Sequence, residues 1–211
     1  MRTIAALLVA IGCIGWFAGF AVVLGVVKIP AWFELPFGAL GGIAVDSDGN
    51  IYCGLQYYSR VQVYDSEGDY IRGIFVDRSG GVFRIRINQN DELEVATARN
   101  DKLYRFGKEG TLVTKLSGVP HYFDEFGEIG ETQYHDERQN ATYQIRWSPF
   151  GAYIAKRSVS GETKVIVRTP FLKWLLMGPF PPWFLPVVGA IMFACVSKLL
   201  LKKGKREKGK R

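Results

Sequence analysis

The chain has 211 residues, 48% of them hydrophobic, and a formal net charge of +7. That length allows one folded domain together with membrane segments. The charge argues against a nucleic-acid-binding domain, because Lys and Arg nearly balance Asp and Glu from Lys28 to Lys173. The positive excess lies instead in the tail from Lys198 to Arg211.

Residues 1–28 are the first predicted element, a transmembrane helix. Thr3 to Val27 carries no charge, and this run exceeds the ~20 residues that a helix needs to cross a bilayer. A secretory signal peptide is the alternative, but its apolar core is usually only ~7–15 residues, and no Ala-x-Ala site closes this run. Gly15 and Gly19 have the spacing that lets another helix approach closely, although glycine is common in membrane helices anyway.

Residues 29–41 are predicted to form a linker that leaves the membrane. Pro30 stops the helix, because proline cannot continue the helical hydrogen-bond ladder. Trp32 suits the interface between lipid and water. We therefore expect Trp32 to mark the level of the lipid headgroups.

Residues 42–71 alternate apolar and polar side chains with period two, and Asp-Gly and Glu-Gly turn signals interrupt the alternation. The same pattern returns without a gap 42 residues later. Ile43, Asp46, Gly49, Ile51 and Gly68 correspond to Ile85, Asn88, Asp91, Leu93 and Gly110. A weaker third copy runs from Ile145 to Val167. A repeat of about 40 residues with four short strands per unit is typical of β-propeller blades.

The segment IAVDSDGNIY, followed by RVQVYDSEGDYI, resembles an NHL repeat, the blade unit of a group of six-bladed propellers. The resemblance is good over 42–71, fair over 82–113 and poor over 144–168, and it covers about half of the chain. The chain departs from the usual pattern at 53–55, where Cys-Gly-Leu replaces Val-Ala-Asp, and at Ser59, where Asn is usual. The resemblance implies a propeller-type fold that binds proteins, RNA or small ligands, but such a likeness does not fix a function.

We therefore predict a mainly β domain at 42–170, made of about three propeller-like four-stranded antiparallel blades, between two transmembrane helices. Three blades cannot close a ring, because propellers need roughly four to eight, and open sheet edges invite pairing with another chain. One hypothesis is a homodimer that completes six blades. The alternative is an open β domain in which the third copy packs as an irregular cap.

An insertion at 117–140 separates the second and third copies and contains both histidines, His121 and His135, with acidic neighbours such as Asp124 and Asp136. These residue types can bind a divalent metal or act as general acid and base. No spacing here matches a known ligand set, neither His-Glu-x-x-His nor a cysteine pair. We therefore predict a solvated acidic loop, with no metal and no other cofactor.

Tyr57, Tyr58 and Arg60 lie between two predicted strands, where propellers often display binding residues. The tyrosines form either a partner-binding surface or a packing contact between blades, and the sequence does not decide between them. The candidate partner or ligand surface comprises Tyr57, Tyr58, Arg60, His121, Asp124, His135 and Asp136.

The segment 46–50 has the composition of a calcium loop, but Tyr57 stands at the twelfth position in place of Glu, so we predict a β-turn. Cys13 and Cys195 lie in the hydrophobic segments, and Cys53 takes a core-facing strand position. Each cysteine is therefore predicted to act as a small hydrophobic residue, with no internal disulfide.

Residues 171–201 return the chain to the membrane. Trp174 to Ser197 carries no charge, but clustered prolines make its first part a poor helix. We predict an interfacial segment with Trp174 and Trp183, followed by a second transmembrane helix; a kinked helix that begins earlier is the alternative. The basic tail at 202–211 should stay cytoplasmic and contact anionic lipid. Both termini are then cytoplasmic, and the β domain is extracytoplasmic.

These features predict a membrane-anchored, exported β module that binds a protein or ligand or acts as a scaffold, with no evident catalytic site. The alternative is an exported hydrolase or lyase that uses His121 and His135, with or without a divalent metal. Convergence of these histidines with carboxylates in one cleft would favour the enzyme. Expected partners are membrane lipid and either a different protein or a second copy of the chain; nucleic acid is not expected.

Overall fold

The computed structural model describes residues 2–23, 26–38, 40–76, 82–99, 101–118, 122–126, 132–149, 151–178 and 181–208. The chain forms two compact units. The helical unit comprises Met1–Val27 and Phe171–Arg211, and the β unit comprises Lys28–Pro170.

The described part of the helical unit contains α1 (Arg2–Val23), α3 (Phe171–Met177) and α4 (Pro181–Lys208). Within α1, Thr3–Val22 is long and apolar enough to cross a membrane by its length and composition. The apolar part of α4, Phe184–Lys198, is shorter than a full span. The second span, and with it the sidedness of the chain, therefore stays a prediction.

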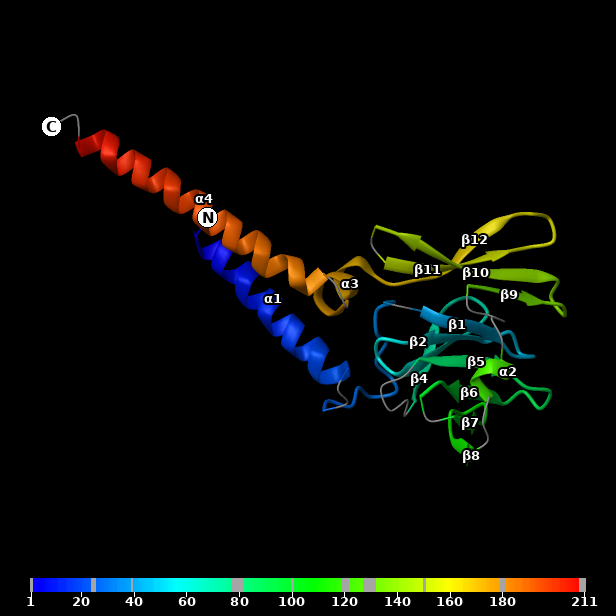
Figure 1. Ribbon diagram of the computed structural model, residues 1–211. Coiled ribbons are helices and arrows are strands. Elements are labelled where there is room, and N and C mark those ends of the chain that lie inside the picture. The colour runs from blue at the N-terminus through cyan, green and yellow to red at the C-terminus, as the bar shows by residue number, and fades with distance from the viewer. Residues whose placement is uncertain are drawn as a thin grey trace. The chain divides into compact units, whose positions relative to one another are not determined.

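Helices α1 and α4 lie antiparallel and pack closely at small residues (Figure 1). A Cβ atom on Gly12 would lie 2.3 Å from Cδ of Pro186, and one on Gly189 would lie 2.7 Å from the carbonyl oxygen of Ala5. A Cβ atom on Gly19 would meet nothing within 4 Å. The close approach of the two helices therefore depends on Gly12 and Gly189, and Gly19 takes no part in it.

The β unit is built mainly from four-stranded antiparallel sheets, each an up-and-down meander. Sheet A contains β1 (Leu40–Val45), β2 (Ile51–Leu55), β3 (Arg60–Tyr64) and β4 (Tyr70–Phe75). Sheet B contains β5 (Phe83–Ile87), β6 (Leu93–Thr97), β7 (Lys102–Phe106) and β8 (Leu112–Ser117). The short helix α2 (Tyr122–Glu125) follows, and sheet C contains β9 (Gln133–Asp136), β10 (Ala141–Ser148), β11 (Gly151–Arg157) and β12 (Thr163–Arg168). The described residues thus form the three four-stranded sheets that the sequence predicts.

The 42-residue repeat between sheets A and B is visible in the backbone. Positive φ angles recur at equivalent turn positions, in the pairs Gly49 (85°) and Asp91 (58°), Ser59 (52°) and Asp101 (41°), and Gly68 (96°) and Gly110 (79°). Asp and Ser thus adopt a conformation that favours glycine, so the turn geometry is repeated even where the residue type is not. In the turn after β1, Oδ1 of Asp46 accepts hydrogen bonds from the backbone N–H groups of Asp48 and Asn50, which confirms the predicted turn.

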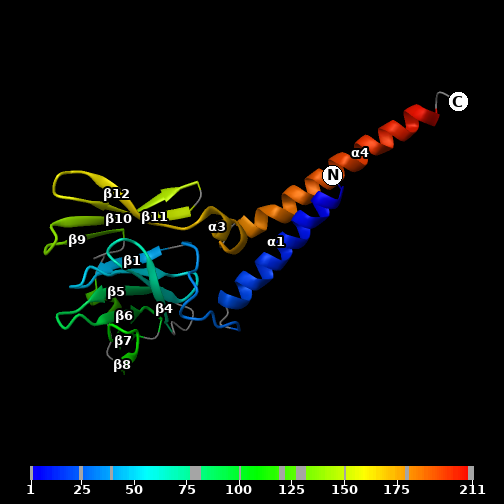
Figure 2. The same ribbon diagram turned by 180° about the vertical axis from the view of Figure 1, so that it is seen from behind.

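Sheet A lies in the middle of the β unit, with sheet B on one side and sheet C on the other (Figure 1 and Figure 2). Strand β1 contacts both β5 and β9, so the first strand of each sheet lies innermost. The main core lies between sheets A and B and includes Tyr52, Val61, Ile85 and Val95. Sheet C therefore does not follow sheet B in space, as consecutive propeller blades would, but packs on the far side of sheet A.

The predicted insertion at 117–140 is not wholly outside the sheets. Its segment Gln133–Asp136 forms β9, and the hydroxyl of Tyr134 donates to the carbonyl oxygen of Val45 in β1 at 3.4 Å. The four residues of β9 are polar or aromatic, so no alternation of aliphatic side chains marked this strand. The third blade therefore begins one strand earlier than the weak third repeat indicates.

Candidate functional site on the outer face of sheet B

Sheet B has two different faces. Toward sheet A it presents side chains such as Ile85, Val95 and Tyr104, which are buried in the shared core. The opposite face, here called the outer face of sheet B, carries two rows of cross-strand partners. One row is charged (Arg86, Glu94, Arg105, then Thr114), and the other is mainly apolar (Arg84, Ala96, Leu103, Leu116).

The repeat shows which side chains a sheet presents at these positions when another sheet packs on it. At the 42-residue shift, the charged row corresponds to Ala44, Tyr52 and Val63 of sheet A, which are buried in the core shared with sheet B. Sheet B therefore carries charges where sheet A carries core side chains. Because burying charges is costly, the charged row disfavours a further blade packing here as sheet B packs on sheet A.

Helix α2 and the residue after it cover the apolar row of the outer face. The apolar cluster there consists of Ala96, Leu103, Leu116, Tyr122 and Phe126. The guanidinium carbon of Arg86 lies 4.1 Å from the centroid of the Phe126 ring, a distance at which the cation attracts the ring face. Helix α2 thus closes the apolar half of the outer face and leaves the charged half open.

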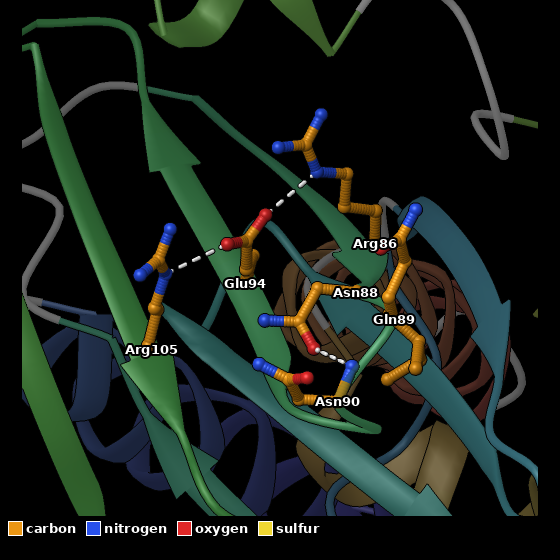
Figure 3. Close-up of a pocket in the computed structure, with 7 residues that line it drawn as sticks. Arg86, Asn88, Gln89, Asn90, Glu94 and Arg105 are labelled. Carbon is orange, nitrogen blue, oxygen red and sulfur yellow. Dashed lines mark hydrogen bonds and ion pairs between the residues drawn. The ribbon is translucent and has the colours of Figure 1, made fainter.

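Glu94 connects the two arginines of the charged row (Figure 3). Its Oε2 accepts a hydrogen bond from Nε of Arg86, and its Oε1 accepts one from Nε of Arg105, each at 2.7 Å. The side chain of Glu94 is 2% exposed, whereas those of Arg86 and Arg105 are 44% and 38% exposed. Burial by itself would raise the pKa of Glu94, but the hydrogen bonds and charges of the two guanidinium groups outweigh it and lower the pKa. The row therefore carries one net positive charge at neutral pH.

A cavity of about 450 Å³ opens over the charged row. It is lined by Arg86, Ile87, Asn88, Gln89, Asn90, Glu94 and Arg105 (Figure 3). Glu94 uses only Nε of each arginine, and among the described residues the terminal nitrogens of Arg86 and Arg105 have no hydrogen-bond partner. The cavity therefore offers charged hydrogen-bond donors to a ligand, which suits an anion.

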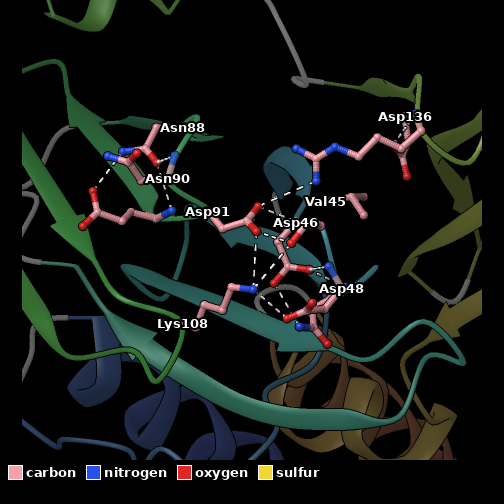
Figure 4. Close-up of polar contacts among 12 residues, drawn as sticks. Val45, Asp46, Asp48, Asn88, Asn90, Asp91, Lys108 and Asp136 are labelled. Atoms are coloured by element: carbon pink, nitrogen blue, oxygen red, sulfur yellow. Dashed lines mark hydrogen bonds and ion pairs between the residues drawn. The ribbon is translucent and has the colours of Figure 1, made fainter.

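A second polar cluster joins the turns of the three sheets (Figure 4). Asp91 accepts hydrogen bonds from the backbone N–H and the hydroxyl of Ser47, and it lies 3.3 Å from Nζ of Lys108 and 3.8 Å from Nη1 of Arg138. Lys108 also pairs with Asp48 at 2.7 Å. The hydroxyl of Ser47 is the main group that lowers the pKa of Asp91, and Lys108 adds to it. These groups satisfy one another, so the cluster connects the sheets and leaves little for a ligand.

Three of the predicted surface residues are buried: Tyr58, Arg60 and Asp136. Tyr58 and Arg60 are each 4% exposed, and the half-buried ring of Tyr57 meets Tyr58 edge to face at 4.9 Å. The guanidinium group of Arg60 donates to the carbonyl oxygens of Ile29, Pro30, Ala31 and Phe33 at 2.9 to 3.2 Å. The burial of Tyr58 agrees with the packing alternative for the tyrosines. Arg60 does not lie on an open surface, because its side chain holds the linker against sheet A.

The predicted site residues of the insertion lie on two different elements. Asp124 is exposed on α2, whereas His135 is exposed on β9, where its Nδ1 lies 3.2 Å from Oγ1 of Thr142. Asp136 is buried and accepts a hydrogen bond from the backbone N–H of Arg138. His121 lies outside the described residues, and within the part of the chain that is described no three His, Cys, Asp or Glu side chains gather to hold a metal.

The aromatic residues predicted for the membrane interface have different surroundings. Trp32 is exposed, and Trp174 stacks on Phe171 with ring centroids 6.1 Å apart. The side chain of Trp183 lies outside the described residues. Cys53 is buried and free, as predicted, and burial raises the pKa of its thiol.

Sequence reasoning missed Arg86, Glu94 and Arg105 as candidate site residues. The signal was present in the repeat, because the 42-residue shift places three charges on three apolar positions of the first copy. A comparison of the copies for chemical mismatch, and not only for similarity, would have found them.

No protein-family model matches the chain, and no curated protein matches it. Among solved structures, it is similar to a catalytically inactive virginiamycin B lyase from Staphylococcus aureus with quinupristin, at 17% identity and a TM-score of 0.37, over 67% of this chain and 45% of that chain. A streptogramin B lyase structure is similar at 14% identity and a TM-score of 0.36, over 65% and 43% of the two chains. A protein of unknown function from Bacteroides caccae is similar at 12% identity and a TM-score of 0.33, over 65% and 52%.

The chain thus spans about half the length of the solved structures that it matches. These likenesses assign no activity to it. The three four-stranded antiparallel sheets agree with the propeller-like blades predicted from the repeats, whereas membership of the NHL group is not confirmed.

Proposed function

We propose that the protein is a membrane-anchored binding module, in which α1 and α4 cross the bilayer and the exported β unit binds an anionic ligand or partner. The observation that supports binding is the open cavity over Arg86, Glu94 and Arg105, on a face that α2 covers only in part. We also propose that sheets A and B are NHL-type blades, on the strength of their shared turn geometry.

The outward surfaces of α1 and α4 support the anchor. Ile14, Phe17, Phe184 and Val187 each expose more than half of their surface. Apolar surface in water costs about 25 cal/mol per Å², whereas lipid tails cover it without that cost. In a bilayer, the close packing at Gly12 and Gly189 would be the ordinary way for two helices to associate.

The antiparallel pairing of the helices also supports the topology. Gly12 faces Pro186, and Ala5 faces Gly189, so the start of α1 is level with the part of α4 shortly before Lys198. Basic residues cluster at that end, in the tail that begins with Lys198. The positive-inside rule places this end in the cytoplasm and the β unit on the other side.

Charge disfavours closing a ring through the outer faces of two copies. The face of sheet C that points away from sheet A carries the exposed side chains of Arg146, Arg157 and Arg168. Stacking it on the outer face of sheet B would bring these side chains toward Arg86 and Arg105. Like charges across an interface cost free energy, so we propose an anionic ligand or a different protein as the partner.

Cysteine accessibility tests the anchor. In sealed membrane vesicles of known orientation, Glu162→Cys, on the turn before β12, and Lys198→Cys should react with a membrane-impermeant maleimide from opposite sides. The wild-type chain is the control, because Cys53 is buried and the other cysteines lie in apolar helices. Labelling of both variants from the same side would contradict the two spans.

A further inference from the structure

We propose that Arg86 and Arg105, held in place by Glu94, bind the carboxylate of a small organic acid in the cavity on the outer face of sheet B. This inference rests on the proposed binding function and names the ligand class of the same site.

The two guanidinium groups are positioned before any ligand arrives. Arg86, Glu94 and Arg105 are direct cross-strand partners on β5, β6 and β7, so the sheet fixes their spacing. The buried carboxylate of Glu94 holds Nε of both arginines, and the ring of Phe126 lies against the guanidinium of Arg86. Side chains that are already ordered lose little entropy when a ligand binds.

The free donor groups match a carboxylate in geometry. With Nε of each arginine taken by Glu94, the pair of terminal nitrogens on each guanidinium faces away from Glu94 (Figure 3). Two parallel N–H groups on a planar guanidinium bind the two oxygens of a carboxylate, an arrangement that a lysine ammonium cannot reproduce.

The charge and size of the cavity limit the ligand further. Two arginines and one ionised Glu94 leave a single positive charge, which one carboxylate neutralises; a phosphate dianion would place excess negative charge beside Glu94. The volume of about 450 Å³ falls in the range of about 300–1,000 Å³ that is usual for small-molecule sites. Gln89 and Asn90 at the rim add amide groups for hydroxyl or amide substituents of the acid.

Protection from arginine modification tests this site in the full chain, solubilised in neutral detergent. Phenylglyoxal modifies accessible arginines, and mass spectrometry gives the rate at each position. We expect glucuronate, a hydroxylated carboxylate, to slow modification of Arg86 and Arg105 several-fold, with sodium chloride at equal ionic strength as the reference. Arg157, which is exposed on sheet C, is the internal control and should react at an unchanged rate.

Two variants separate recognition by the guanidinium fork from attraction by charge alone. Arg105→Lys keeps the charge and should abolish the protection of Arg86 by glucuronate. Arg157→Lys should leave the protection of Arg86 intact. An unchanged thermal transition shows that each variant is folded. Three outcomes would overturn the proposal: no protection by glucuronate, equal protection of Arg157, or protection by inorganic phosphate alone. The protection assay needs no membrane, so its failure would not contradict the proposed membrane anchor. Likewise, cysteine labelling that contradicts the two spans would not contradict the carboxylate site.

Discussion

Gly68 of sheet A lies so close to Ile166 of sheet C that a Cβ atom on Gly68 would stand 2.2 Å from the carbonyl oxygen of Ile166. Gly68 also has a φ of 96°, a conformation that L-residues rarely adopt. Its missing side chain therefore serves both the turn between β3 and β4 and the contact between two sheets.

Replacing Gly68 with alanine should separate these two roles when it is compared with Gly161→Ala. Gly161 has a similar φ of 83°, but a Cβ atom there would meet nothing within 4 Å. Gly161→Ala should lower the unfolding free energy only by the cost of placing an L-residue at a positive φ, about 1–2 kcal/mol. Gly68→Ala should lower the unfolding free energy by about 2 kcal/mol more, because the backbone must move to relieve the clash. Urea unfolding of the full chain in detergent measures both, and equal losses would contradict the close contact.

Arg60 should be essential for holding the linker on sheet A. Its guanidinium donates to carbonyl oxygens in the segment 29–33, and a lysine cannot supply the same fork of donors. The hydroxyl of Tyr70 donates to two of these carbonyl groups as well. We expect Arg60→Lys to lose about 2 kcal/mol of unfolding free energy, since several carbonyl groups lose a charged donor. Limited proteolysis should then cut the segment 29–33 faster than in Arg157→Lys, an exposed control. Unchanged proteolysis would show that the linker is held by other contacts.

Thr169 should stabilise the β unit through its hydroxyl. Thr169→Val keeps the shape of the side chain but leaves the buried N–H of Phe37 without its acceptor, at a cost of about 1–3 kcal/mol. Thr169→Ser retains the hydroxyl and should lose much less. The two midpoints of urea unfolding measure the difference, and similar midpoints would mean that the methyl group matters more than the hydrogen bond.

The repeat in the sequence predicted much of the β unit, because period-two alternation and turn residues are local signals. The positive φ of Asp91, where the first copy has Gly49, shows that the register was correct even where the residue type changed. Strand β9 was not predicted, because its four residues show no alternation of aliphatic and polar side chains. The order of the sheets could not be predicted either, because local patterns do not determine on which face of sheet A sheet C packs.

The candidate site was harder to predict for a different reason. Arg60 looked like a surface residue because an arginine in a loop is usually exposed, yet long-range contacts to the linker bury it. Arg86 and Arg105 looked like ordinary polar positions of an alternating strand. Only the register across β5, β6 and β7 shows that both side chains meet at Glu94.

The helical unit predicts a matched set of glycine variants. Gly12→Ala and Gly189→Ala should push α1 and α4 apart, because each Cβ atom would lie within 3 Å of atoms on the other helix. Gly19→Ala should leave the pairing unchanged, since its Cβ atom points into open space. Spin labels at Ile14 and Val187, both exposed, report the separation by pulsed electron resonance. A shift of equal size in all three variants would contradict the packing at Gly12 and Gly189.

Glu94 should make the stability of the β unit sensitive to acid. Its pKa is lowered in the folded protein, because the hydrogen bonds and charges of Arg86 and Arg105 outweigh its burial, whereas in the unfolded chain it lies near ~4.3. The folded state therefore binds this proton more weakly than the unfolded state. The stabilisation is present at neutral pH and is lost as the pH falls below about 4, through the folded pKa.

The variant Glu94→Gln should remove this dependence. We expect the variant to lose about 2 kcal/mol of unfolding free energy at pH 7, because two charged hydrogen bonds are weakened. On acidification it should lose less unfolding free energy than the wild-type chain does. Unfolding free energies measured at neutral pH and at the lowest pH at which the chain stays folded give both quantities, with Glu162→Gln on an exposed turn as control. Asp91, whose pKa is also lowered by Ser47 and Lys108, retains its own acid sensitivity in both variants. A Glu94→Gln chain that loses as much stability in acid as the wild type would show that Glu94 does not titrate as an ion pair with the arginines.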